Sequence, residues 1–321
     1  MPWFLALLLL FASCERRELT YYMEAEITVT ADWSRAGVPE EKDDGVTLVI
    51  FPQDGSEPRV ILTGERERTI VRLPRGTYDA ILFNRSFTDF SNLLFTGMES
   101  LKSLEAYAKE VVTRADTRVI VSSPDKLASG TVRNFEVTDD MLGNYAPPAA
   151  RGVCPEGACR MHFTPTPLTR HIRVTLNVKG LHNIREVRCT LDGVPLSVFL
   201  HDGHAGEELG GQQFTVGNPV FAEGSFTDGH LTGELDVFGF DRSLSHSIAL
   251  KALLVDGKTV VEQTLTGITV EEETDSAGNI MLYIDASAPE VFPDVKPEGG
   301  SDSGFDVDVD EWEDEEVDIP V

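Results

Sequence analysis

The sequence predicts a mainly β protein with two tandem antiparallel β-sandwich domains and one short helix. Most of its apolar runs are short, rich in β-branched residues and bounded by turn residues, as strands are. Asp192-Gly193 and Asp256-Gly257 each lie between two such runs, and this pair favours a hairpin turn because glycine accepts a positive φ. Strand patterns do not alternate with helical ones, which argues against a parallel sheet.

The first domain is expected over residues 26–144. Alternating, β-branched segments predict strands at residues 26–31, 46–51, 69–73, 76–83, 118–121 and 131–137. One stretch departs from this pattern, because the apolar residues Leu101, Leu104, Ala108 and Val111 recur at helical spacing. This spacing predicts the short helix over residues 98–113.

A proline-rich stretch at residues 145–168 divides the chain and is expected to be a linker or a long crossing loop. The second domain follows over residues 169–289. Its clearest strand is 171–179, in which every second residue is apolar. Strands are also expected at residues 185–191 and 194–200, at 248–255 and 258–264 around the two Asp-Gly pairs, and at 279–284.

The first thirteen residues are uncharged and strongly apolar, but they are shorter than the ~20 residues that span a membrane. They predict a signal peptide at 1–13, although no Lys or Arg precedes the apolar run. Phe11-Ala12-Ser13-Cys14 resembles a bacterial lipobox, so Cys14 is the expected site of acyl chains such as palmitate, and 14–25 the lipidated tether. The alternative is an ordinary cleaved signal with an incidental cysteine.

The formal net charge is −27, with 54 acidic residues against 27 Lys and Arg. Nucleic-acid binding needs clustered basic residues, so no nucleic-acid partner is expected. Export permits disulfides. Cys154 and Cys159 flank a Pro- and Gly-containing loop and form the disulfide candidate, which leaves Cys189 as a buried thiol.

No motif in the chain predicts catalysis, a metal or a cofactor. Ser123 and Lys126 have the spacing of serine acyl-transferases, but a proline follows the serine where a helix is needed. His201 and His204 flank Asp202-Gly203, and we interpret this segment as a solvated turn rather than a metal site. Asp275-Ser276-Ala277 resembles an O-glycosylation acceptor, which makes Ser276 the modification candidate.

The acidic tail, residues 290–321, holds thirteen acidic residues and one Lys, a net charge of −12. Its end nevertheless keeps a period of two, which is typical of a strand with one apolar face. We interpret this end as a candidate for strand exchange through its apolar residues, which are Phe305, Val307, Val309, Trp312, Val317 and Ile319.

Four segments together resemble a known family. They are CERRELTYY after the signal, LPRGTYDAILFN at 73–84, GELDVFGF at 233–240 and the ending GFDVDVDEWEDEEVDIPV. In this order they resemble Bacteroides-type lipoproteins of unknown function related to fimbrillins and minor-fimbrium anchor proteins. The resemblance implies two transthyretin-like sandwiches, attachment to the outer membrane and pilus assembly by exchange of strands. It implies no catalytic residues.

The function expected from this resemblance is that of a non-enzymatic surface lipoprotein, acting as a fimbrial anchor or fimbrillin-like subunit in pilus assembly and adhesion. Its partners would be the membrane, through the lipid, and fimbrial subunits, through strand addition. The alternative is a glycan-binding surface lipoprotein of a nutrient-uptake system, with a glycan or host-surface ligand. The chain holds only 3 Trp to form a stacking platform, although Tyr and Phe can also stack on sugars.

Replacing Cys14 with Ala is expected to release the protein from the membrane fraction without unfolding it, because acyl chains rather than polypeptide would hold it there. Membrane fractionation after a high-salt wash measures the release, and circular dichroism checks the fold. Retention of the variant in the washed membrane would contradict lipidation as the sole anchor.

Overall fold

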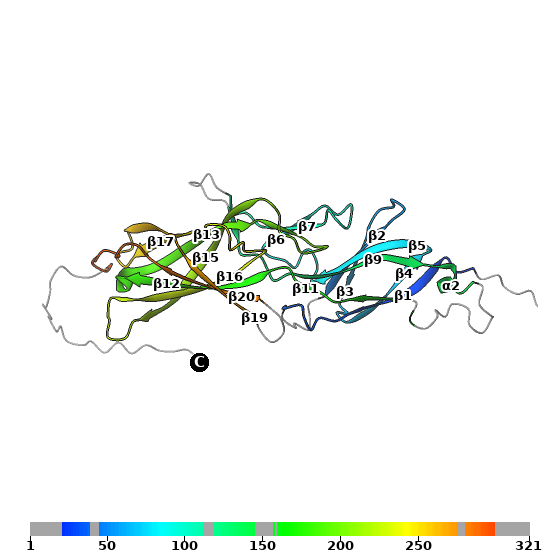
Figure 1. Ribbon diagram of the computed structural model, residues 1–321, viewed down its shortest axis with the longest axis horizontal. Coiled ribbons are helices and arrows are strands. Elements are labelled where there is room, and N and C mark those ends of the chain that lie inside the picture. Colours follow the sequence, from blue (N-terminus) through cyan, green and yellow to red (C-terminus); the bar gives the residue numbers. More distant parts are fainter. Residues whose placement is uncertain are drawn as a thin grey trace, which may run out of the picture.

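The computed structural model describes residues 21–38, 45–111, 119–144, 157, 159–274 and 280–298. These residues form two β lobes that lie end to end along the long axis of the molecule (Figure 1). The mainly β fold class predicted from the sequence is confirmed. Among the described residues, three strand pairs are parallel rather than antiparallel: β1 (Glu24–Ala31) with β10 (Arg160–Phe163), β12 (Arg170–Lys179) with β20 (Ile280–Ser287), and β8 (Ile120–Ser122) with β15 (Leu209–Phe221).

The described part of the N-terminal lobe contains three sheets. The first has the order β10-β1-β4, the second β11-β9-β5-β2-β3, and the third β14-β7-β6. Their strands are β1 (Glu24–Ala31), β2 (Val46–Pro52), β3 (Arg59–Thr63), β4 (Arg68–Pro74), β5 (Gly76–Asn84), β6 (Leu93–Thr96), β7 (Glu105–Ala108), β9 (Ala128–Val137), β10 (Arg160–Phe163), β11 (Thr166–Pro167) and β14 (Ser197–Phe199).

The second of these sheets is the middle layer, and it is buried on both faces. Leu48 of β2 belongs to one apolar cluster with Ile27 of β1, whereas its neighbour Val49 belongs to another with Leu104. All four side chains are 0% exposed. Because neither face meets water, β2 is apolar at nearly every position, a pattern expected for a strand covered on both sides.

The predicted helix at residues 98–113 is wrong. This segment contains a turn and then the strand β7, which pairs with β6 on one side and β14 on the other. Leu101, Leu104 and Ala108 are buried as expected, but their spacing reflects a turn folded under a short strand. The α-helix among the described residues is α2 (Asp139–Leu142), which ends at Gly143 with a φ of 68°.

The C-terminal lobe is one continuous sheet with the order β18-β17-β13-β15-β16-β12-β20-β19, to which β8 is added beside β15. Residues from both ends of the sheet share one apolar cluster, so the sheet coils around its core as the two layers of a sandwich do. Its strands are β8 (Ile120–Ser122), β12 (Arg170–Lys179), β13 (Ile184–Pro195), β15 (Leu209–Phe221), β16 (Asp228–Val237), β17 (Ile248–Leu254), β18 (Val260–Leu265), β19 (Thr269–Thr274) and β20 (Ile280–Ser287).

Only one of the two predicted Asp-Gly hairpins forms. Gly257 has a φ of 66° and lies in the turn between the paired strands β17 and β18. Gly193 has a φ of 80° but lies inside β13, where the register with β15 shifts between Asp192 and Val194. The hairpin expected around Gly193 is therefore wrong, because a β-bulge uses a positive-φ glycine just as a turn does.

The predicted linker at 145–168 is not wholly a loop. Residues 160–163 form β10, which pairs in parallel with β1, and residues 166–167 form β11, which pairs with β9. Phe163 is 0% exposed in the N-terminal core. The chain thus returns to the first lobe at β10 and β11 before β12 begins the long strands of the second.

The C-terminal core also extends beyond the expected boundary at residue 289. Phe292 is 1% exposed within the core cluster, and its backbone N–H donates to the carbonyl of Lys179 at 3.0 Å. Gly180, with a φ of 79°, passes so close that an added Cβ would lie 2.5 Å from the Phe292 carbonyl oxygen. Residues 290–298 are part of the folded lobe, and the tail beyond them lies outside the described residues.

Phe292→Ala is expected to lower the free energy of unfolding by about 3–5 kcal/mol, because it leaves a cavity in a closed core. The neighbouring Val291 is 62% exposed and supplies the matched control, since Val291→Ala should stay within about 0.5 kcal/mol. Urea denaturation of both variants measures the difference. Equal stabilities would show that the segment does not close the core.

Candidate functional site

The junction between the lobes is built by exchange of strands. β14 comes from the second half of the sequence but pairs with β7 of the first, whereas β8 comes from the first half but pairs with β15 of the second. Leu196, Val198 and Leu200, which lie in or beside β14, are buried in the same cluster as Leu104. The two lobes therefore share both hydrogen bonds and apolar core.

A buried carboxylate lies at this junction. Glu105 is 9% exposed and accepts a hydrogen bond from the Ser197 hydroxyl at 2.5 Å and another from the Tyr107 hydroxyl at 2.8 Å. The hydrogen bond to Glu105 also raises the pKa of Tyr107. A buried carboxylate without partners would be costly, so both bonds stabilise Glu105, and the one from Ser197 joins β14 to β7.

Hydroxyl groups make further connections between the lobes. Ser129 donates to the carbonyl of Leu200 at 2.6 Å, and Ser123 accepts from the backbone N–H of Asp236 at 2.8 Å. Ser123, which has the spacing of an acyl-transferase serine relative to Lys126, therefore has a structural role in the junction. These hydrogen bonds lie at the junction of the two lobes, which follow one another along the long axis in Figure 1.

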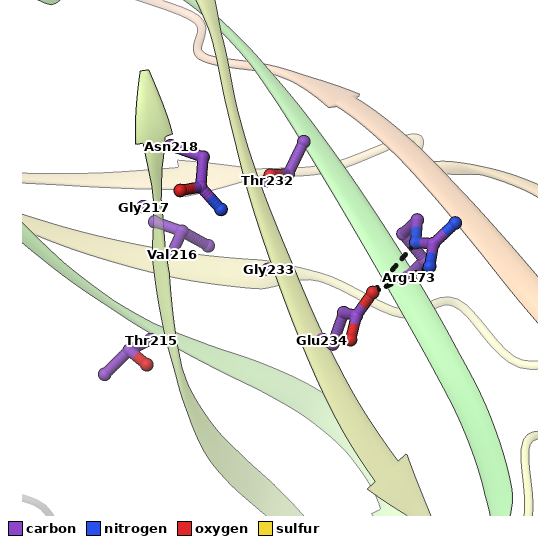
Figure 2. A pocket seen from close by; sticks show the side chains of 8 residues that line it. All are labelled: Arg173, Thr215, Val216, Gly217, Asn218, Thr232, Gly233 and Glu234. Atoms are coloured by element: carbon purple, nitrogen blue, oxygen red, sulfur yellow. Dashed lines mark hydrogen bonds and ion pairs between the residues drawn. The ribbon is translucent and has the colours of Figure 1, made fainter. Parts of the chain in front are cut away.

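A groove of about 500 Å³ lies on the outer face of the C-terminal sheet, over β12, β15 and β16 (Figure 2). Arg173 donates from Nε and Nη2 to one oxygen of Glu234, at 3.0 and 2.8 Å. This pair lowers the pKa of Glu234, chiefly through the hydrogen bond from Arg173, and raises the pKa of Arg173. Both side chains are about half exposed, so the pair contributes little stability.

The backbone of β15 shapes this groove. Its register with β16 shifts between Gly217 and Val220, and Asn218 has a positive φ of 52°. Gly233 also lines the groove. It lies so close to Val216 that an added Cβ would be 2.7 Å from Val216 Cγ1. The lining is mostly polar, so the groove offers hydrogen bonds to a polar ligand rather than an apolar pocket. Sequence reasoning missed it, because the register shift depends on pairing with β16.

Two edge strands differ sharply in character. β19, at one end of the C-terminal sheet, holds three consecutive exposed glutamates, Glu271–Glu273, and such charges discourage pairing with other chains. β3, at one end of the middle sheet, instead exposes Val60 and Leu62, at 45% and 59%. β3 therefore offers unpaired backbone groups beside apolar side chains, which is the arrangement that accepts an added strand.

Most of the predicted site residues lie outside the described residues. These are Cys14, Cys154, Ser276 and the tail residues Phe305, Val307, Val309, Trp312, Val317 and Ile319. Cys159 is described, and it is disulfide-bonded and buried. Its pairing with Cys154 stays a prediction.

The aromatic platform that a glycan-binding site would need is not formed by Trp33, the one tryptophan among the described residues. Trp33 is half-buried, its indole N–H donates to the carbonyl of Arg66 at 2.9 Å, and the Arg66 guanidinium lies over its ring at 4.6 Å. The ring is thus engaged within its own domain.

Within the part of the chain that the structure describes, no helix has the length and apolar character to cross a membrane.

Comparison with known proteins places the chain first in a structural class and then in a family. It shares its two-lobed β fold with a crystal structure described as a "putative adhesin" from Bacteroides ovatus, with a TM-score of 0.57, 17% identity, and coverage of 79% of this chain and 87% of the other. The family model described as a domain of unknown function, DUF5119, matches residues 13–214. The chain belongs to this family.

Two further relatives carry functional descriptions. A "putative fimbrium anchoring subunit Fim4B" of Bacteroides ovatus is 26% identical over 193 residues, which cover 59% of this chain and 52% of the relative. The chain thus spans about half the length of that relative. The fimbrial anchor protein Mfa2 of Porphyromonas gingivalis has a TM-score of 0.44 and 10% identity, over 84% of this chain and 100% of the other.

The thiol of Cys189 is expected to resist alkylation in the folded protein. Cys189 is a free cysteine, 1% exposed in β13, and burial raises its pKa to about 12, so the reactive thiolate is scarce at neutral pH. Iodoacetamide labelling before and after denaturation measures this protection. Peptide mapping of the same samples should find Cys159 joined to Cys154, and a bridge to Cys189 would overturn the assignment.

Proposed function

We propose that this chain is a non-enzymatic surface lipoprotein that anchors a fimbrium to the outer membrane or forms one of its subunits. The similarity to a relative described as a fimbrium anchoring subunit supports this role, as does the fold shared with a described adhesin. Cys14 would hold the protein in the membrane through its acyl chains. The described domains then extend from that tether.

The observation that carries the proposal is the exchange of strands at the junction. An anchor must transmit tension from a filament to a membrane without its domains separating. Here pulling the lobes apart would require β14 to leave β7 and β8 to leave β15, together with exposure of the shared apolar cluster. A flexible linker between independent domains would offer no such resistance.

Subunit association would use strand addition, in which main-chain hydrogen bonds supply affinity and alternate side chains supply specificity. The tail has the required alternation of apolar and acidic residues from Phe305 to Asp310. Its apolar side would pack on a sheet, while the carboxylates would stay in water and limit unspecific pairing. The tail can dock on an edge of its own chain or of a neighbouring subunit.

Immuno-electron microscopy on cells that make fimbriae tests the role. Label at the base of the filaments is expected for an anchor, and a deletion strain should release filaments into the medium until the gene is restored. Label along the filaments would indicate a stalk subunit instead. Label on the bare surface, with filaments unaffected by the deletion, would contradict a fimbrial role and favour the glycan-binding alternative.

Deleting residues 305–321 distinguishes the two docking modes. If the tail binds a neighbouring subunit, the melting temperature should be unchanged while co-purification with partner subunits is lost. If it closes its own domain, melting should fall by several degrees. A matched variant with Val307→Ser and Val309→Ser keeps every carboxylate and should reproduce either effect, because the apolar face is the part that docks.

A truncated chain with unchanged melting and unchanged association would contradict both docking modes. The tail would then act only as a solvated acidic end.

A further inference from the structure

Three side chains with metal-binding atoms converge in the loop between β14 and β15. His201, Asp202 and His204 each offer one such atom, and all these atoms lie within 4.8 Å of one another. His201 Nε2 lies 3.1 Å from one oxygen of Asp202, and His204 Nδ1 lies 2.5 Å from the other. The sequence interpretation as a solvated turn is incomplete here, because the side chain of His201 is only 10% exposed.

The loop holds these groups in place through its own hydrogen bonds. Gly203, with a φ of 73°, makes the turn and donates its N–H to the carbonyl of Phe199 at 2.9 Å. The Phe199 N–H donates to the carbonyl of His204 at 3.0 Å, and the His204 N–H donates to Asp202 Oδ1 at 3.1 Å. The Phe199 ring stacks on that of His204, with centroids 4.2 Å apart.

We propose that His201, Asp202 and His204 bind one divalent transition-metal ion of the zinc type. Two imidazoles and a carboxylate are a favourable ligand set for such an ion, with the remaining position taken by water. Tetrahedral zinc at its usual bond lengths separates neighbouring ligand atoms by about 3.3 Å. The separation of His201 Nε2 from Asp202, 3.1 Å, is close to this value, whereas His204 Nδ1 lies 2.5 Å from Asp202 and would have to move outward to bind the ion. Asp202 and His204 are 45% and 53% exposed, so little packing opposes this movement.

The residues around the loop affect its expected affinity for a metal ion. Burial, which disfavours the charged imidazolium, lowers the pKa of His201. Lys102 and Arg133 act electrostatically on the same ring and oppose a cation. His201 Nδ1 is buried without a hydrogen-bond partner, so no outer acceptor strengthens this ligand. These features indicate a site of moderate affinity.

Binding at this loop would reinforce the junction between the lobes. Thr131 of β9 donates its hydroxyl to the carbonyl of His201 at 3.2 Å, and Ser129 binds the neighbouring carbonyl of Leu200. The loop thus connects the N-terminal lobe to β14 and β15. An ion that binds only the folded loop stabilises the folded protein by mass action. The ion-bound protein should therefore have a higher melting temperature than the ion-free protein.

The test uses the untagged mature chain, titrated with Co²⁺ by absorption spectroscopy and with Zn²⁺ by calorimetry. One equivalent of each ion is expected to bind, and Zn²⁺ should raise the melting temperature by a few degrees. His204→Ala and Asp202→Asn, both at exposed positions, should weaken binding by about tenfold or more, because even loss of an outer-shell partner costs about 10–100-fold. The zinc-dependent rise in melting temperature should disappear with them.

His182→Ala is the matched control. His182 also faces a carboxylate, with its Nε2 3.3 Å from Asp294, but it brings no second imidazole. This variant should bind zinc as the unchanged chain does. Excess Ca²⁺ should not compete, which separates the site from loose binding to the acidic surface. Failure to bind one equivalent of zinc at millimolar concentration, or equal binding by His204→Ala, would overturn the proposal.

Discussion

The exchange of β14 and β8 between the lobes is the constraint on which the rest of the structure depends. β14 brings an apolar stretch from the second half of the chain under the first, and this stretch covers the face of the middle sheet that β1 and β4 leave open. β2 can be apolar at almost every position only because that second cover exists. Without β14, the cover that β6, β7 and β14 form over the middle sheet would lose the buried side chains of Leu196, Val198 and Leu200.

The sequence predicted strands well where one face is solvated and poorly where structure depends on distant pairing. β12 keeps its period of two because one of its faces is exposed. Asp192-Gly193 and Asp256-Gly257 are locally equivalent, yet only the second is a turn. They differ because β13, which contains Asp192-Gly193, continues through this pair and is paired with β15 on one side and β17 on the other. The residues around the Asp-Gly pair do not reveal this pairing. The false helix at 98–113 has the same origin, since β7 exists through its neighbours β6 and β14.

The functional residues divide in a similar way. The sequence identified Cys159 as a bridged cysteine candidate and Cys189 as a buried thiol from spacing and alternation alone. It did not identify the convergence of His201, Asp202 and His204, because burial of His201 depends on the packing of the loop against the N-terminal lobe and on its bond to Thr131. The apolar edge of β3 was also missed. Val60 and Leu62 resemble ordinary core residues until the end of the sheet is known.

The parallel pairing of β1 with β10 has a consequence for biogenesis. Thr28 pairs with Arg160, so β1 stays incompletely paired until about half of the chain has been synthesised. β7 obtains its second partner later still, when β14 (Ser197–Phe199) has been synthesised. Such distant closures slow folding because chain entropy must be lost before contacts are gained. The first lobe therefore cannot reach its final pairing as an isolated N-terminal fragment, and its closure is coupled to the appearance of the second half of the chain.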